Sequence, residues 1–130
     1  MDLTGPVERA IRSSIQAPLE LETPTQGKGF VVDRITDRGI VLLLGEQQTS
    51  TPLSWECLEG IVEHLRGRGW MKIGSKYEVT ADPDTLDAYL KRCTKRATAG
   101  WVAAVLERAG VIRINRSRPT SVRLEPGFSA

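Results

Sequence analysis

The sequence predicts an α+β fold, because helical and β-type patterns are mixed along one short chain. Apolar residues recur at helical spacing in four segments, and aliphatic, β-branched runs bounded by Gly, Asp or Asn separate them. The chain has 130 residues, of which 40% are hydrophobic and 26% charged, as is ordinary for a globular protein. A chain of this length can bury a real core.

Residues 1–28 are predicted to form a helical arm and a linker. The helix spans 7–15, with Thr4 as its cap and a proline in its first turn, where the missing N–H costs nothing. Residues 17–28 contain two prolines and no helical period, so we expect a linker there. The apolar stripe of the helix could pack on the main body or on a second copy of the chain, as a homodimer.

Residues 29–130 form the predicted domain, which opens with a β-hairpin. The runs 29–35 and 40–44 are rich in β-branched and aliphatic residues, and an Asp and a Gly between them favour a tight reversal. The second run is apolar on both faces, so we expect it to be covered on both sides. Residues 46–52 are polar and are predicted to form a loop.

A helix is predicted from Ser54, a good N-terminal cap, because apolar residues follow it at i, i+3, i+4 and i+7. It ends at the glycines of 67–69, and 70–74 has the pattern of a short strand. Residues 82–84 then open a second helix with acidic side chains at its positive end. The apolar face of that helix consists of Leu86, Tyr89 and Leu90.

A third helix is predicted over 98–109, because its apolar residues fall on one face and Gly110 follows where helices end in a left-handed residue. Two strands close the chain, at 111–114 and 120–124. Their residues alternate between apolar and charged, as a half-buried hairpin requires.

The order helix, strand, helix, helix, hairpin is that of a winged helix-turn-helix. Its turn would fall at 94–97, and its wing at 115–119, a loop rich in turn residues. The third helix leads directly into an apolar strand, so helix and hairpin must share a core. Winged helices also serve as protein-interaction modules, and the order of elements leaves that alternative open.

Charge is distributed unevenly along the chain. Residues 91–125 hold nine Lys and Arg against two Glu, a net charge of +7, whereas residues 1–90 hold nine against fourteen Asp and Glu, a net charge of −5. A cationic end on an acidic chain most often meets a polyanion, and nucleic acid is the commonest one. The alternative is a solvated basic face without a partner.

These cations fall where a winged helix would contact DNA. Lys95 and Arg96 lie beside the positive end of the third helix, where phosphates bind. Arg116 and Arg118 could enter a minor groove, follow the backbone or belong to a basic surface loop. The small side chains of the third helix would face the bases, unless that face packs on the N-terminal hairpin. The predicted contacts with double-stranded DNA are Lys91, Arg92, Lys95, Arg96, Thr98, Ala99, Gly100, Ala103, Arg116, Ser117 and Arg118.

Other chemistry finds little support in the sequence. His64 is the single histidine, so no His-based zinc cluster or nuclease motif can form, and we expect no catalytic residue, metal or cofactor. Cys57 and Cys93 are predicted to be thiols in a reducing cytoplasm rather than a disulfide. No stretch approaches the ~20 apolar residues of a membrane span, and the N-terminus lacks a secretory signal. Core packing, rather than stacking on bases, is predicted for Trp55, Trp70 and Trp101.

Three segments resemble the N-terminal region of actinobacterial McrA-type HNH endonucleases: RGIVLLLG at 38–45, LSWECLE at 53–59 and TAGWVAAVLE at 98–107. The similarity covers roughly 29–124 and rests on these short runs of shared residues rather than on a diagnostic motif. Those proteins are modification-dependent restriction enzymes with separate modules for sensing modified DNA and for cutting. The resemblance implies that this chain is a DNA-sensing or docking module. The HNH motif is absent from it.

Overall fold

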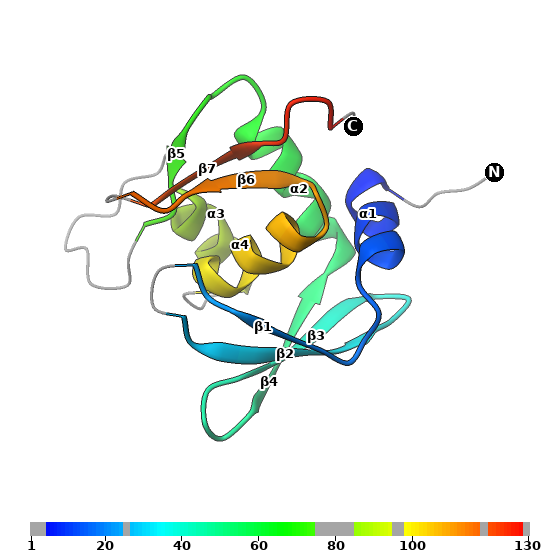
Figure 1. The fold of residues 1–130 in the computed structure, drawn as a ribbon. Helices are drawn as coiled ribbons and strands as arrows, with labels where there is room; N and C mark the ends of the chain where they lie inside the picture. The colour runs from blue at the N-terminus through cyan, green and yellow to red at the C-terminus, as the bar shows by residue number, and fades with distance from the viewer. Residues whose placement is uncertain (1–4, 25–26, 75–84, 95–97, 118–119, 129–130) are drawn as a thin grey trace.

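The fold is α+β, as predicted, with two antiparallel sheets and helices between them (Figure 1). Strands in the order β1-β2-β3-β4 form one sheet, and strands in the order β5-β7-β6 form the other. No described helix is long and apolar enough to cross a membrane. The computed structural model describes residues 5–24, 27–74, 85–94, 98–117 and 120–128.

Helix α1 (Pro6–Ser14) confirms the predicted N-terminal helix, and it packs on the body of the molecule rather than standing apart from it. Its first turn is held by Glu59 of α2 (Trp55–Leu65), whose carboxylate accepts hydrogen bonds from the backbone N–H groups of Val7 and Glu8 at 3.0 and 2.9 Å. Those N–H groups have no partner within the helix, so the carboxylate acts as a cap supplied from a distance. The apolar stripe is buried at Val7, Ile11 and Ile15.

The four-stranded sheet contains two strands that the sequence analysis missed. β1 (Leu19–Glu22) lies in the predicted linker and pairs with β2 (Gly29–Ile35). β4 (Thr49–Ser54) lies in the predicted polar loop and pairs with β3 (Gly39–Leu44). Both are edge strands with one face in solvent, so both contain many polar residues, and an edge strand tolerates the proline within β4.

The predicted hairpin of β2 and β3 is confirmed, and β3 is covered on both faces as expected. The two strands pair antiparallel, with an irregular register between Val32 and Arg34. Gly39 starts β3 so close to β4 that a Cβ at this position would collide with the carbonyl group of Leu53. Glycine is therefore required here by close packing of two backbones.

From residue 54 onward the predicted elements are present. The Ser54 hydroxyl accepts a hydrogen bond from the Cys57 N–H at 3.1 Å and caps α2 as predicted. Gly110, with φ +78°, ends the helical segment as predicted. The elements that follow α2 are β5 (Met71–Lys72), α3 (Leu86–Thr94), α4 (Ala99–Arg108), β6 (Ile112–Asn115) and β7 (Ser121–Leu124).

Some predicted features fall outside the described residues. They are the cap at Thr4, the end of the linker at 25–26, the opening of a helix at 82–84, the turn at 95–97 and the loop residues 118–119.

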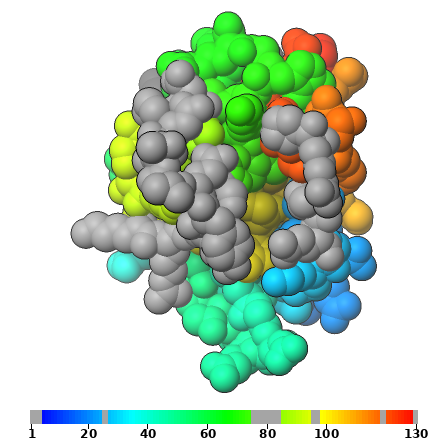
Figure 2. All heavy atoms as spheres, turned by 90° about the vertical axis from the view of Figure 1, so that its left-hand side faces the viewer, coloured from blue at the N-terminus to red at the C-terminus, as the bar shows by residue number. Residues whose placement is uncertain are grey.

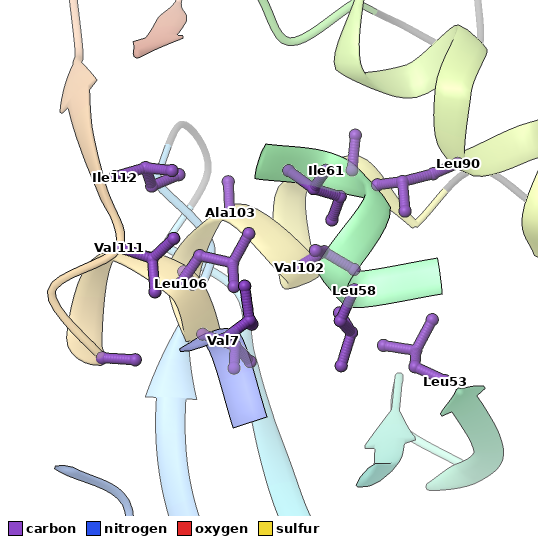
Figure 3. Close-up of a cluster of buried hydrophobic side chains, with 14 of the residues drawn as sticks. Val7, Leu53, Leu58, Ile61, Leu90, Val102, Ala103, Leu106, Val111 and Ile112 are labelled. Atoms are coloured by element: carbon purple, nitrogen blue, oxygen red, sulfur yellow. The ribbon is translucent and has the colours of Figure 1, made fainter. Parts of the chain in front are cut away.

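Helices α2 and α4 lie between the two sheets and join them in one hydrophobic cluster (Figure 1). In Figure 3, side chains from α2 and α4 point toward one another and toward the strand that follows α4. Each fully buried aliphatic side chain contributes roughly 1.5–3 kcal/mol to stability. The cluster includes Leu58, Ile61, Val102, Ala103, Leu106, Val111 and Ile112.

Candidate nucleic-acid interface

The end of α3, the start of α4 and the end of the β6–β7 hairpin at which β6 stops and β7 begins lie on one side of the molecule, at the left of Figure 1. Figure 2 looks at this side and shows α3 on one flank, the hairpin on the other and the start of α4 between them. The predicted DNA contacts all belong to these elements or to the connections between them. The elements that carry the described contacts thus lie on one side of the molecule, on two flanks.

On the first flank, Lys91 and Arg92 are exposed in the last turn of α3, where cations are favoured by the helix dipole. The ammonium group of Lys91 lies 2.8 Å from a carboxylate oxygen of Asp87. The Asp87 side chain is only 9% exposed, so the exposed Lys91 is held by a carboxylate that is itself buried. The guanidinium of Arg92 lies 5.9 Å from the ring centroid of Tyr89. Both cations are thus positioned by neighbours one turn earlier.

On the second flank, Arg116 makes two parallel hydrogen bonds to Glu107 of α4, at 2.8 and 2.7 Å. These bonds raise the pKa of Arg116 above its ordinary value, so its positive charge is fixed. Both side chains are substantially exposed, and exposed ion pairs contribute only about 0–1 kcal/mol. A phosphate would compete with the Glu107 carboxylate for the same two N–H groups. Ser117 is exposed beside it, and its N–H donates to the Asn115 side chain at 2.9 Å.

Lys95, Arg96 and Arg118 lie outside the described residues, so the structure does not place these three predicted contacts.

The start of α4 corrects part of the predicted interface. Thr98, Ala99 and Ala103 are 1%, 4% and 0% exposed, so they offer almost no surface to a duplex. Gly100 is partly buried, and a Cβ there would come within 3.9 Å of the Thr23 side chain, next to β1. The small residues let α4 pack closely against the N-terminal sheet, which is the alternative that the sequence left open. We remove these residues from the candidate interface.

Cations that the sequence analysis did not select lie on the solvent side of the three-stranded sheet. We call this side the outer face, because Met71, Ile112 and Val122 point the opposite way, into the core. Strand alternation was visible in the sequence, but without strand pairing it could not show that these side chains are neighbours. The outer face consists of Trp70, Lys72, Arg113, Asn115, Ser121 and Arg123.

The predicted core position of Trp70 is wrong, because this side chain is 47% exposed. Trp55 is buried, and Trp101 is partly buried against the core, as predicted. Trp70 immediately precedes β5, next to the inward Met71, and alternation along the strand turns it outward.

The two cysteines belong to α2 and α3, which pack on one another. Cys57 is buried and Cys93 is exposed, and both are free thiols. Burial, together with the neighbouring Cys93, raises the pKa of the Cys57 thiol, which disfavours the nucleophilic thiolate. Tyr89 donates a hydrogen bond to the Cys57 carbonyl at 2.7 Å, and a Cβ at Gly60 would collide with the same hydroxyl. His64 stacks on Tyr89 with ring centroids 5.0 Å apart, so it is a packing residue.

No protein-family model matches this chain, and no curated protein or solved structure matches it either. The resemblance to McrA-type endonucleases therefore stays a prediction from three segments of sequence. Fold and surface charge are the observations from which a function can be proposed.

Proposed function

We propose that this chain is a double-stranded DNA-binding module built on a winged helix-turn-helix. The observation that carries the proposal is the placement of exposed cations on α3 and on the β6–β7 hairpin of a chain whose first 90 residues have a net negative charge. The element order α2, β5, α3, α4, β6, β7 supports the fold assignment. So does the strand order β5-β7-β6, because the short strand between the first two helices joins the hairpin.

Contact with DNA is through phosphates more than through bases. The α4 face that would enter a major groove is packed against the N-terminal sheet. Lys91 and Arg92 on α3 and Arg116 on the hairpin remain as cations at the surface. Arginine and lysine contacts to phosphate fix a protein on the duplex without reading sequence. Binding is then weakly sequence-dependent and strongly dependent on salt.

Salt titration tests this interface. The logarithmic slope of affinity against salt should become shallower by about one for each phosphate contact removed. Arg116→Ala and the double variant Lys91→Ala/Arg92→Ala should each show this change with a plain duplex. Arg34→Ala is the matched control, because Arg34 is an exposed arginine on the four-stranded sheet. If the slopes of all variants equal that of the parent, the flanks are not the interface.

We further propose that the module senses or docks DNA for a modification-dependent restriction endonuclease, and that it is not itself catalytic. The support is the resemblance of 38–45, 53–59 and 98–107 to McrA-type enzymes. A panel of methylated, hydroxymethylated, phosphorothioated and plain duplexes of one sequence tests the sensing role. Equal affinities across the panel would leave only general DNA binding.

The alternative is a winged-helix module for protein interaction or dimerisation. The burial of α4 favours it, since it removes the face with which such folds read DNA. Gel filtration with light scattering, with and without a duplex, separates the two proposals. A stable protein dimer that ignores duplex DNA would support the alternative.

A further inference from the structure

We propose that the outer face of the three-stranded sheet binds single-stranded nucleic acid, with Trp70 stacking on an unpaired base and the cations beside it contacting phosphates. This surface shares the β6–β7 hairpin with the second flank, but its cations, Lys72, Arg113 and Arg123, are not those proposed to contact the duplex.

Strand pairing places three of these side chains in one row across the sheet. Arg113 of β6 lies directly opposite Arg123 of β7. The pairing of Met71 with Val122, extended by one residue, sets Trp70 opposite Arg123 on the other side. The Arg123 guanidinium lies 5.5 Å from the Trp70 ring centroid, which confirms that they are neighbours. The row thus consists of an aromatic ring followed by two guanidinium groups. Its members lie on neighbouring strands, whose backbones are about 5 Å apart.

A second row lies beside the first and is polar. Lys72 is opposite Ser121, and Ser121 is opposite Asn115. All three point to the same side of the sheet as the first row, because side chains alternate along each strand. The outer face therefore has an aromatic side chain at one corner, three cations and two neutral hydrogen-bonding side chains.

The charges of this surface favour an anionic partner. Two arginines directly opposite one another repel, which is unfavourable in a sheet unless something offsets it. Arg113 is paired with Glu125 at 2.8 Å, and Arg123 lies over Trp70. With Lys72, these side chains carry three positive charges against one negative charge. A phosphate chain crossing the rows would neutralise the excess.

The ring of Trp70 favours an unpaired base over a duplex. Trp70 is the one large apolar side chain among the described residues that is exposed. Stacking on an aromatic side chain is available to any base, and it is the usual means by which proteins hold single strands. In a duplex the faces of the bases are already stacked on one another, so the ring would have nothing to cover. An aromatic ring beside a row of cations therefore fits a single strand.

Binding measurements with a labelled 20-nucleotide oligo(dT), the matching oligo(rU) and a 20-base-pair duplex test the inference. Trp70→Ala should weaken binding of the single strands about tenfold and leave duplex affinity within about twofold. Trp70→Phe should retain most of the affinity, because it keeps a ring. Arg34→Ala, on the other sheet, should match the parent. Binding of either oligonucleotide supports the inference, and the tighter of the two identifies DNA or RNA as the preferred strand.

Tryptophan emission tests the stacking directly. Emission should fall when oligo(dT) binds, and the fall should vanish in Trp70→Phe, which still binds. No binding of either single strand at low salt overturns the inference, and so does an equal loss of single-strand and duplex affinity in Trp70→Ala. The double variant Lys91→Ala/Arg92→Ala should lose duplex affinity alone. A parent that binds single strands but no duplex would remove the proposed duplex function and leave this inference standing.

Discussion

The two sheets of this protein have similar inner faces and different outer ones. Both bury aliphatic residues against α2 and α4, and these side chains belong to one cluster. On the solvent side, β1 of the four-stranded sheet exposes Glu20 and Glu22. The three-stranded sheet carries Lys72, Arg113 and Arg123 at its outer face, beside an exposed tryptophan. The inner faces stabilise the fold in the same way, so the charges of the outer faces are what distinguish the two sheets as binding surfaces.

The largest expected effect tests whether the two sheets are one folding unit. Leu106 is fully buried on α4 between them, and Leu106→Ala should cost about 2–5 kcal/mol of unfolding free energy through lost burial and a cavity. Urea unfolding followed by circular dichroism and by tryptophan emission should give coincident midpoints that shift together. Separate midpoints for the two probes would show that the molecule does not unfold as one cooperative unit.

Alkaline pH should weaken the packing of α3 on α2. Burial raises the pKa of the Cys57 thiol above its ordinary 9.0 and the pKa of the Tyr89 hydroxyl above its ordinary 10.0. Above those values the unfolded chain loses protons that the folded protein retains. The stability contributed by the Cys57 thiol is therefore complete below about pH 9, and that contributed by the Tyr89 hydroxyl below about pH 10. Above those values each contribution falls, by at most about 1.4 kcal/mol per pH unit.

Urea midpoints measured between pH 7 and pH 10.5 check this expectation. Tyr89→Phe keeps the ring that stacks on His64 and removes the titrating hydroxyl, so its loss of stability at high pH should be smaller. Identical pH profiles for the parent and Tyr89→Phe would contradict the role given to the tyrosine.

Removing the distant cap should loosen α1 alone. Glu59→Ala leaves the backbone N–H groups of Val7 and Glu8 without their acceptor, which should cost about 1 kcal/mol, as for the loss of a helix cap. Hydrogen exchange should accelerate in α1 and stay unchanged in the three-stranded sheet. Glu56→Ala, an exposed glutamate of the same helix, is the matched control. Equal acceleration in both sheets would mean that the arm supports the whole fold.

The smallest expected effect concerns the facing arginines. Arg113→Ala removes a like-charge neighbour of Arg123 together with the ion pair to Glu125, and these changes oppose one another. We expect a net change in unfolding free energy within about 0.5 kcal/mol. The same substitution should lower single-strand affinity at low salt more than at high salt. A loss of several kcal/mol would assign Arg113 to the fold rather than to binding.

The elements that the sequence predicted correctly are those whose apolar pattern and end signals both lie within one short stretch of the chain. The stripe of α2 with its Ser54 cap, the left-handed Gly110 after α4 and the alternation of β6 are of this kind. β1 and β4 were missed because an edge strand buries only one face, and its short mixed pattern becomes a strand only through pairing with the neighbouring strand.

The candidate site was harder to predict, because it depends on which surfaces the fold covers. Ala99 and Ala103 fit a helix that approaches DNA and equally a helix that approaches β1, and only the packing decides between them. Arg113 and Arg123 are ten residues apart in sequence, and their meeting depends on the register of the hairpin. The pairing of β5 with β7 likewise sets Trp70, an expected core residue, on the exposed side.

The contact between Gly60 and Tyr89 has a consequence for how the chain can diverge. Gly60 has no Cβ, and the Tyr89 hydroxyl occupies the space that a Cβ at position 60 would fill. A descendant that acquires alanine at position 60 must shorten or displace the side chain at position 89 in the same lineage. The side chains tolerated at positions 60 and 89 are therefore coupled through the packing of α2 on α3.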